Sequence, residues 1–183
     1  MSLKPGKYGQ NEVTFSAVPS RRSDVISAKG KARVEHDIAG HAARKGEPWA
    51  FIAYGPPGTG KSRHVERVEQ GTGGRLLKVD ASSLPALGVQ EVGFLLDALR
   101  PSHLLVDDFD RAPVDETRAR LLFLFEHLHA AHAGTTVAVT VNDPTALDAA
   151  LLRSERIDDA QEFALPDAAE RADIIGQIGR AHV

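Results

Sequence analysis

The segment Gly55-Pro56-Pro57-Gly58-Thr59-Gly60-Lys61-Ser62 carries the strongest structural signal in this chain. It matches the complete pattern G-x-x-x-x-G-K-[ST], in which a glycine-rich turn bends the backbone so that successive N–H groups point inward and bind phosphate. In this pattern the lysine reaches the β- and γ-phosphates, and the hydroxyl of the last residue faces Mg²⁺. We therefore predict that residues 55–62 bind the phosphates of a nucleotide, with Ser62 also at the metal.

The residues on either side of this loop support the interpretation. Trp49–Tyr54 is an apolar run that predicts a buried strand, and a helix is expected from about Lys61 to Gln70. A strand, a glycine-rich loop and a helix in this order form the setting that the pattern requires. The positive N-terminal end of such a helix also attracts anions. A plain glycine-rich turn is the alternative, and the surrounding sequence speaks against it.

Length and composition limit the other possibilities. The chain has 183 residues, 42% apolar and 26% charged, which is ordinary for one globular domain. Its net charge of -3 gives no basic footprint, so a nucleic-acid partner is not favoured, although a local basic patch stays compatible with it. There is no cysteine to form disulfides or thiolate metal sites. Neither a membrane-spanning run nor a signal-peptide core is found, so we expect a cytoplasmic protein without a membrane partner.

Strand and helix patterns alternate along the rest of the chain. This alternation predicts an α/β fold with a parallel sheet and helices on both faces. Asp167 followed by Glu170 predicts a capped final helix. The polar residues 1–22 are expected to form a poorly ordered arm. Further strands are expected near 75–80, 103–110, 135–141 and 160–165, and further helices near 27–44, 89–99, 115–132 and 147–152.

Asp107 and Asp108 end the apolar run that starts at His103. At the carboxyl end of a parallel strand next to a phosphate loop, one carboxylate can hold Mg²⁺ and the next can act on the attacking water. We predict the first role for Asp107 and the second for Asp108. Two solvated carboxylates at a strand end are the alternative, but buried parallel strands favour apolar ends unless the site is used.

Asn142 follows the apolar run 135–141 and is expected at the same edge of the sheet. An amide there can fix the attacking water beside the γ-phosphate without adding charge. The alternative is that Asn142-Asp143-Pro144 forms only a turn, which its composition also favours.

A family resemblance adds to these observations. The segment from Thr140-Val141-Asn142-Asp143-Pro144 through Leu147-Asp148-Ala149-Ala150-Leu151-Leu152-Arg153-Ser154-Glu155-Arg156-Ile157-Asp158 closely resembles the AAA ATPase pattern T-N-x-P-x-x-L-D-x-A-L-x-R-x-G-R-x-D. Together with the loop and the double Asp, the resemblance covers the chain from about Asp24 onward. It implies a P-loop NTPase three-layer sandwich over residues 23–183, with a five-stranded parallel sheet in the order 5-1-4-3-2.

The resemblance also implies roles for single residues. Asn142 matches the position that senses the γ-phosphate, and Arg153 and Arg156 match arginines that reach into a neighbouring subunit's site. A guanidinium there would stabilise the charge of the transferring phosphoryl group. Without the resemblance, both arginines read as surface cations at a helix end. Asp37 and Ile38 would border the adenine. ATP and Mg²⁺ are the implied cofactors, and a self-associated ring of six or seven copies is the implied assembly.

Within the family the chain is most similar to the branch of the mitochondrial Rieske-protein translocase. The similarity rests on residues 30–38 and on Asp108, where most relatives have Glu. No aromatic residue lies between Ser82 and Val89, where threading motors carry one, so hand-over-hand pulling is not expected. The chain ends at Val183, about one helix into the region of the helical lid, so most of the lid is expected to be absent.

The sequence therefore predicts Mg-dependent ATP hydrolysis that drives the remodelling of a protein or protein–nucleic-acid client. The sequence does not identify this client. A nucleotide-gated binding module, such as a replication loader with little turnover, is the alternative from another class. The Asp at position 108 and the missing lid favour that alternative. A small-molecule kinase is a third interpretation, against which the segment 147–158 speaks.

Overall fold

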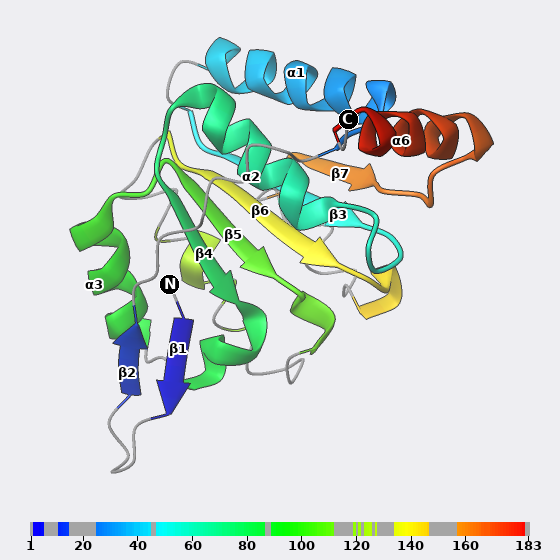
Figure 1. The fold of residues 1–183 in the computed structure, drawn as a ribbon. Coiled ribbons are helices and arrows are strands. Elements are labelled where there is room, and N and C mark those ends of the chain that lie inside the picture. Colours follow the sequence, from blue (N-terminus) through cyan, green and yellow to red (C-terminus); the bar gives the residue numbers. More distant parts are fainter. Residues whose placement is uncertain are drawn as a thin grey trace.

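A five-stranded sheet forms the centre of the described part of the chain (Figure 1). The computed structural model describes residues 2–5, 11–14, 25–44, 47–86, 89–111, 119, 121, 123–125, 127, 134–146 and 157–181. The strands of this sheet are β3 (Trp49–Tyr54), β4 (Leu76–Asp80), β5 (His103–Asp107), β6 (Thr136–Val141) and β7 (Asp159–Glu162). The helices include α1 (Ala28–Ala43), α2 (Lys61–Thr72), α3 (Val89–Leu99) and α6 (Ala168–Ala181).

The strands all run parallel, in the order β4-β5-β6-β3-β7. Trp49 of β3 and His103 of β5 both lie opposite Thr136 of β6, so the three central strands start level with one another. If the five strands are numbered along the chain from β3, their order in the sheet is 2-3-4-1-5. This is the predicted order 5-1-4-3-2, listed from the opposite edge of the sheet. The predicted fold class is confirmed. Because the strands are parallel, their carboxyl ends meet at one edge, where the phosphate loop also lies.

Alternate strand residues pack on opposite faces of the sheet. Ile52 of β3 belongs to one hydrophobic cluster and its neighbour Phe51 to another, as the two-residue period of a strand requires. The first cluster includes Leu96 of α3, and the second includes Val65 of α2. Helices therefore cover both faces, and the three central strands β3, β5 and β6 are buried almost throughout, whereas the edge strands β4 and β7 carry exposed polar residues.

Side-chain caps fix the starts of two helices. The Ser27 Oγ accepts a hydrogen bond from the Gly30 N–H at 3.1 Å and begins α1. At α6, the Glu170 N–H donates to Asp167 Oδ1 at 2.9 Å, and the Asp167 N–H donates to Glu170 Oε2 at 3.2 Å. This reciprocal pair is the capping box that the sequence predicted.

Strand β5 is shorter than the sequence predicted. It was expected to run to Asp110 but ends at Asp107, because Asp108 has a left-handed φ of 54° that no strand residue can adopt. A 3₁₀ turn over Phe109–Arg111 follows. This break turns the chain at the carboxyl edge and lets consecutive Asp side chains leave the strand in different directions.

Two other boundaries differ or stay open. β7 spans Asp159–Glu162, so the expected strand at 160–165 ends earlier and the chain continues without regular structure to α6. The expected helix at 147–152 lies outside the described residues, as does most of the one at 115–132. The buried side chains Leu121, Leu124 and Phe125 of that second segment belong to the core.

The N-terminal segment contains a hairpin that its polar composition did not predict. β1 (Ser2–Pro5) pairs antiparallel with β2 (Asn11–Thr14) in a separate two-stranded sheet. Across the part of the chain that the structure describes, no helix combines the length and the apolar character needed to cross a bilayer.

Two histidines pack together at the amino edge of the sheet, opposite the phosphate loop. The rings of His41 and His103 lie 4.9 Å apart, and His41 Nδ1 lies 2.9 Å from the Thr136 hydroxyl. His103 is 1% exposed. Burial, and then the charge of His41, lower the pKa of His103 from 6.5 to about 4. The folded protein therefore holds His103 neutral.

We predict that this histidine makes the fold sensitive to mild acid. Between pH 6.5 and 4 the unfolded chain binds a proton at His103 that the folded chain does not, so the free energy of unfolding falls as the pH falls. The loss should reach up to about 3 kcal/mol near pH 4. Urea unfolding from pH 8 to 4 measures it. His103→Phe should flatten the pH dependence, whereas His36→Gln on the exposed side of α1 should not; equal slopes in all three proteins would contradict the assignment.

Candidate functional site

The phosphate loop lies where the sequence predicted it, between the end of β3 and the start of α2. The Gly55 N–H donates to the carbonyl of Val141 at 3.1 Å, which ties the first residue of the loop to the end of the neighbouring strand β6. The loop therefore starts at the carboxyl edge of the sheet and returns into the N-terminus of α2, whose free N–H groups attract anions.

Two glycines of the loop are required by its backbone. Gly55 has a φ of 139°, and a Cβ atom there would lie 2.2 Å from the carbonyl oxygen of Phe163. Gly60 precedes α2 with a φ of 90°. Side chains are strained in both conformations, and at Gly55 the neighbouring backbone leaves no room for one. The chain after β7 therefore packs directly against the loop.

Lys61 lies inside the loop. Its Nζ donates to the carbonyl oxygens of Gly55 at 2.7 Å and Pro56 at 2.9 Å, and to Asn142 Oδ1 at 3.0 Å. Burial lowers the pKa of Lys61 below its ordinary value, and the neighbouring aspartates act in the opposite direction. The ammonium thus lies between the loop backbone and the end of β6.

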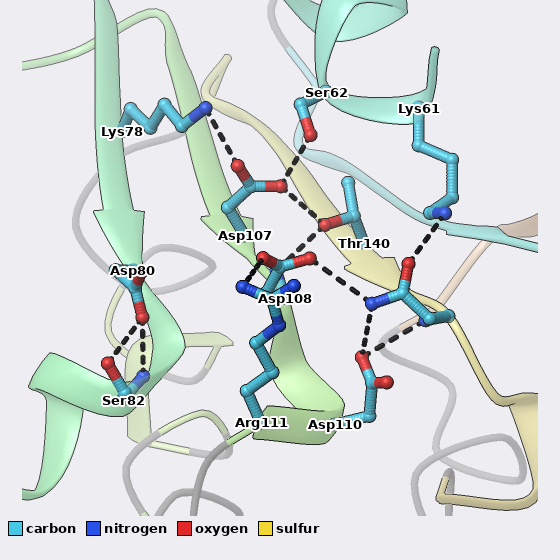
Figure 2. A network of polar contacts seen from close by, with 11 residues as sticks. Lys61, Ser62, Lys78, Asp80, Ser82, Asp107, Asp108, Asp110, Arg111 and Thr140 are labelled. Atoms are coloured by element: carbon cyan, nitrogen blue, oxygen red, sulfur yellow. Dashed lines mark hydrogen bonds and ion pairs between the residues drawn. The ribbon is translucent and has the colours of Figure 1, made fainter. Parts of the chain in front are cut away.

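Asp107 is the centre of a network of polar contacts (Figure 2). Its Oδ1 accepts hydrogen bonds from the hydroxyls of Ser62 and Thr140, each at 2.6 Å, and its Oδ2 lies 2.7 Å from Lys78 Nζ. Burial alone raises the pKa of Asp107, but the hydrogen bonds from Lys78, Ser62 and Thr140 outweigh it and hold the pKa below its ordinary value. The carboxylate is therefore ionised and firmly oriented.

Asp108 lies beside this carboxylate but faces other partners. Its Oδ2 lies 3.1 Å from an Arg111 guanidinium nitrogen, and its Oδ1 accepts a hydrogen bond from Asn142 Nδ2 at 3.2 Å. The Asp108 N–H donates to the Thr140 hydroxyl at 2.9 Å. Thr140 therefore fixes both aspartates, one through the side chain and the other through the backbone.

Asn142 connects the two halves of the site. Its amide oxygen accepts from Lys61, and its amide nitrogen donates to Asp108 and, at 3.2 Å, to Asp110 Oδ1. The Asn142 N–H also donates to Asp110 Oδ1 at 3.0 Å. The amide is thus more than part of a turn, because it links the loop lysine to the carboxylates that follow β5.

The structure brings together five residues that the sequence singled out, and adds three that it missed. Thr140 lies in the segment that resembles the AAA pattern but received no role there, and Lys78 and Asp110 had no motif to mark them. A hydroxyl within the otherwise apolar strand β6 was a usable signal for Thr140. Lys78 and Asp110 gave no such signal, because their contacts depend on the register of β4 and on the turn after β5. The five predicted residues are Lys61, Ser62, Asp107, Asp108 and Asn142.

The oxygen atoms of Ser62 and Asp107 fit a magnesium ion that is shared with phosphate groups. A hydroxyl and a carboxylate in contact are hard oxygen ligands, and Mg²⁺ typically takes only one or two protein ligands when phosphates and water supply the rest. Within the described residues no group of three or more His, Asp or Glu side chains could hold a metal by itself.

A cavity of about 280 Å³ adjoins the loop. It lies between the segment before α1, the loop and the segment between β7 and α6. Its lining combines apolar side chains with charged ones, which include Lys29, Arg33, Arg63, Arg67 and Glu170. Other residues of the lining are Val25, Ile26, Ser27, Gly58, Gly60 and Phe163.

Asp37 and Ile38 do not line this cavity. Asp37 is 2% exposed, and its Oδ2 lies 2.7 Å from His64 Nε2 and 3.1 Å from Gln161 Nε2. Ile38 packs against the backbone of Gly71 in α2. The structure thus gives both residues a packing role between α1, α2 and β7. Val25 and Ile26, which precede α1, do line the cavity. The assignment of Asp37 and Ile38 to the adenine stays a prediction from the resemblance.

Arg153 and Arg156, the predicted arginines for a neighbouring subunit, lie outside the described residues. Their assignment stays a prediction from the sequence.

Comparison with known proteins agrees with this geometry. Residues 51–165 match the family described as "ATPase family associated with various cellular activities (AAA)". The chain belongs to the AAA family. The predicted family is thereby confirmed.

Relatives of this AAA chain include long proteins. It is 30% identical over 146 residues to the ATPase family gene 2 protein of Schizosaccharomyces pombe, a match covering 70% of this chain and 18% of that protein. It is 32% identical over 144 residues to a 26S proteasome regulatory subunit 4 homolog of Oryza sativa subsp. japonica, covering 68% of this chain and 32% of that protein. The chain thus spans a third or less of these relatives.

A solved AAA structure shares the fold. The FIGL-1 AAA domain in complex with ADP superposes with a TM-score of 0.67 at 21% identity, covering 87% of this chain and 60% of that chain. At this identity the likeness shows the fold alone.

We predict that the AAA phosphate loop tolerates a methyl group at one glycine and not at another. Gly55→Ala should lower the free energy of unfolding by at least about 3 kcal/mol, because the added Cβ overlaps the Phe163 carbonyl and φ is unfavourable. Gly58→Ala is the matched control, since φ is also positive (81°) but nothing lies within 4 Å, and should cost about 1 kcal/mol. Chemical denaturation measures both; equal losses would show that the contact with Phe163 is unimportant.

Proposed function

We propose that this chain is a Mg-dependent ATPase module, formed by residues 23–183, that hydrolyses ATP in sites completed between copies. The observation that carries the proposal is the convergence of Lys61, Ser62, Asp107, Asp108 and Asn142 at one edge of the sheet, within a connected set of hydrogen bonds. AAA membership supports the same function.

The loop and Lys61 would bind the β- and γ-phosphates. The N–H groups of residues 58–62 would donate to phosphate oxygens, as the pattern requires, since Pro56 and Pro57 have no N–H. Lys61 Nζ, now bonded to two loop carbonyls, carries the charge that phosphate needs at the same place. Ser62 and Asp107 would hold magnesium, which when bound neutralises charge on the phosphate oxygens.

Asp108 and Asn142 would act on the attacking water. The water oxygen forms a bond to the γ-phosphorus, the bond to the oxygen between the β- and γ-phosphorus breaks, and the water proton passes to the Asp108 carboxylate. The Asn142 amide, 3.2 Å from that carboxylate and 3.0 Å from Lys61, orients the water relative to the γ-phosphate. The reaction is then limited by positioning and by charge stabilisation.

The base would occupy the cavity beside the loop. Val25 and Ile26 give the cavity an apolar lining, and Phe163, whose ring is covered by the Arg33 guanidinium at 4.4 Å, also belongs to the lining. A purine needs such flat apolar contact together with a few polar atoms. We therefore place the adenine against the segment before α1 rather than against Asp37 and Ile38.

Neighbouring copies would complete each site. Arg153 and Arg156 would reach the γ-phosphate of the adjacent copy, and the assembly would be a ring of six or seven chains that remodels a protein or protein–nucleic-acid client. The relatives support an ATPase module without naming a client for this chain. The translocase-like branch stays a hypothesis that rests on Asp108 and residues 30–38, and the relatives named above belong to other kinds.

A nucleotide-gated binding module with little turnover is the second candidate. The observation that favours it is the ion pair of Asp108 with Arg111, because the carboxylate has to leave the guanidinium before it can face the attacking water. This candidate keeps the same phosphate and magnesium contacts and differs only in the rate of the chemical step.

The principal test separates binding from turnover. We expect Lys61→Ala to weaken ATP binding at least tenfold, and Asp108→Asn to keep binding but lower phosphate release about 100-fold or more, since a general base contributes about that much. Asp143→Asn is the matched control, because this carboxylate is exposed and accepts hydrogen bonds from Thr145 within its own turn. Calorimetry and a phosphate-release assay measure the two steps. A wild type that binds ATP without releasing phosphate would establish the second candidate; no binding in millimolar Mg²⁺ would refute both.

The shared site predicts turnover that depends on concentration. Phosphate release per chain should rise with protein concentration and fall strongly in Arg153→Ala and Arg156→Ala. Mixing Lys61→Ala with Arg156→Ala should restore part of the activity, because the first variant supplies an intact arginine to the intact loop of the second. Arg75→Ala, at the amino edge of the sheet, serves as the control. Concentration-independent turnover that survives both arginine substitutions would exclude the assignment.

A further inference from the structure

A lysine side chain, Lys78, forms an ion pair with Asp107, the carboxylate that we assign to the metal. Lys78 lies in the middle of β4, and its side chain extends toward the end of β5, where Nζ lies 2.7 Å from Asp107 Oδ2 (Figure 2). The same Nζ lies 3.7 Å from Glu66 Oε1 of α2. The ammonium is thus held between two acidic side chains that come from different elements.

Asp107 does not need Lys78 for its orientation. Its other oxygen is fixed by the hydroxyls of Ser62 and Thr140, both at 2.6 Å. The contribution of Lys78 is therefore its charge, which neutralises a carboxylate that is only 14% exposed. A divalent cation at Asp107 would supply the same neutralisation.

Glu66 does not depend on Lys78 either. Glu66 is buried, and its Oε2 is paired with Arg63 one turn earlier in α2. Glu66 Oε1 faces Lys78 and offers the ammonium a second acidic partner without a change in the backbone. Lys78 can thus leave Asp107 and remain paired.

We propose that Lys78 is an internal counterion that competes with Mg²⁺ for Asp107 and sets the magnesium requirement of the site. Without metal, Lys78 neutralises Asp107; with metal, its ammonium moves to Glu66. The inference rests on the proposed function, because it concerns the metal that accompanies the nucleotide. It makes Lys78 a positioning residue, which acts on the reaction only through Asp107.

The experiment measures metal affinity directly. Mn²⁺ is titrated into the chain saturated with ADP and followed by electron paramagnetic resonance, so that no turnover is required. Lys78→Met keeps the length of the side chain and removes the charge, and should bind Mn²⁺ about tenfold more tightly, the effect of one unit charge at this distance in a partly exposed site. Lys78→Arg keeps the charge and should stay within about twofold of the wild type. Lys31→Gln removes an equal charge from the exposed side of α1 and should change nothing.

A second variant tests the inference in the opposite direction. Glu66→Gln removes the alternative partner, holds Lys78 on Asp107 and should weaken Mn²⁺ binding several-fold. This variant keeps the charge of Lys78, so it remains informative if Lys78→Met does not fold.

The outcomes separate this inference from the proposed function. Binding of a fluorescent ADP analogue in EDTA is measured first for every variant, and its absence throughout would overturn the proposed function. With ADP binding intact, an unchanged or weaker Mn²⁺ affinity in folded Lys78→Met would overturn the inference. If Lys78→Met does not fold, Mn²⁺ binding to Glu66→Gln that is as tight as in the wild type, or tighter, would overturn the inference.

Discussion

The hydrogen bonds to the Asp107 carboxylate join the separate parts of the site. They connect the end of β5 to α2 through Ser62, to β6 through Thr140 and to β4 through Lys78, all within 2.6 to 2.7 Å. A carboxylate this far from water is stable only when its charge and lone pairs are satisfied. The hydrogen bond between Ser62 and Asp107 therefore fixes the start of α2 relative to the sheet. It also fixes the phosphate loop, which immediately precedes α2.

Charge balance explains why so many polar groups gather at this edge. Three carboxylates lie at the end of β5 and in the turn after it, and each has a partner of opposite charge or a hydrogen-bond donor. Because the site is nearly neutral, a nucleoside triphosphate would bring a large uncompensated charge, which Lys61 alone cannot balance. Metal binding together with the nucleotide follows from this balance. The pairs are Asp107 with Lys78, Asp108 with Arg111, and Asp110 with Asn142.

The sequence predicted the features that depend on local pattern. Patterns of neighbouring residues predicted the phosphate loop, the capping box at Asp167 and the alternation of strands and helices. The order of the strands in the sheet was implied by the family resemblance. Contacts between distant segments were less accessible. Nothing in the sequence distinguishes Lys78 from other strand residues, and its contact with Asp107 depends on how β4 is aligned with β5. Asp37 likewise contacts His64 only because α1 packs on α2. The left-handed φ of Asp108 likewise has no clear sequence signal, since Asp adopts this region more often than most residues but still does so rarely.

Whether this AAA chain turns over ATP or only binds it depends on the strength of one contact. Arg111 holds Asp108, but its side chain is 67% exposed, and an ion pair so open to water contributes only about 0 to 1 kcal/mol. Releasing Asp108 to accept a proton therefore costs little compared with the gain from general-base catalysis. The Asn142 amide keeps the carboxylate in place when Arg111 leaves. For this reason the ion pair supports a pure binding module less than the geometry around Asn142 supports an ATPase.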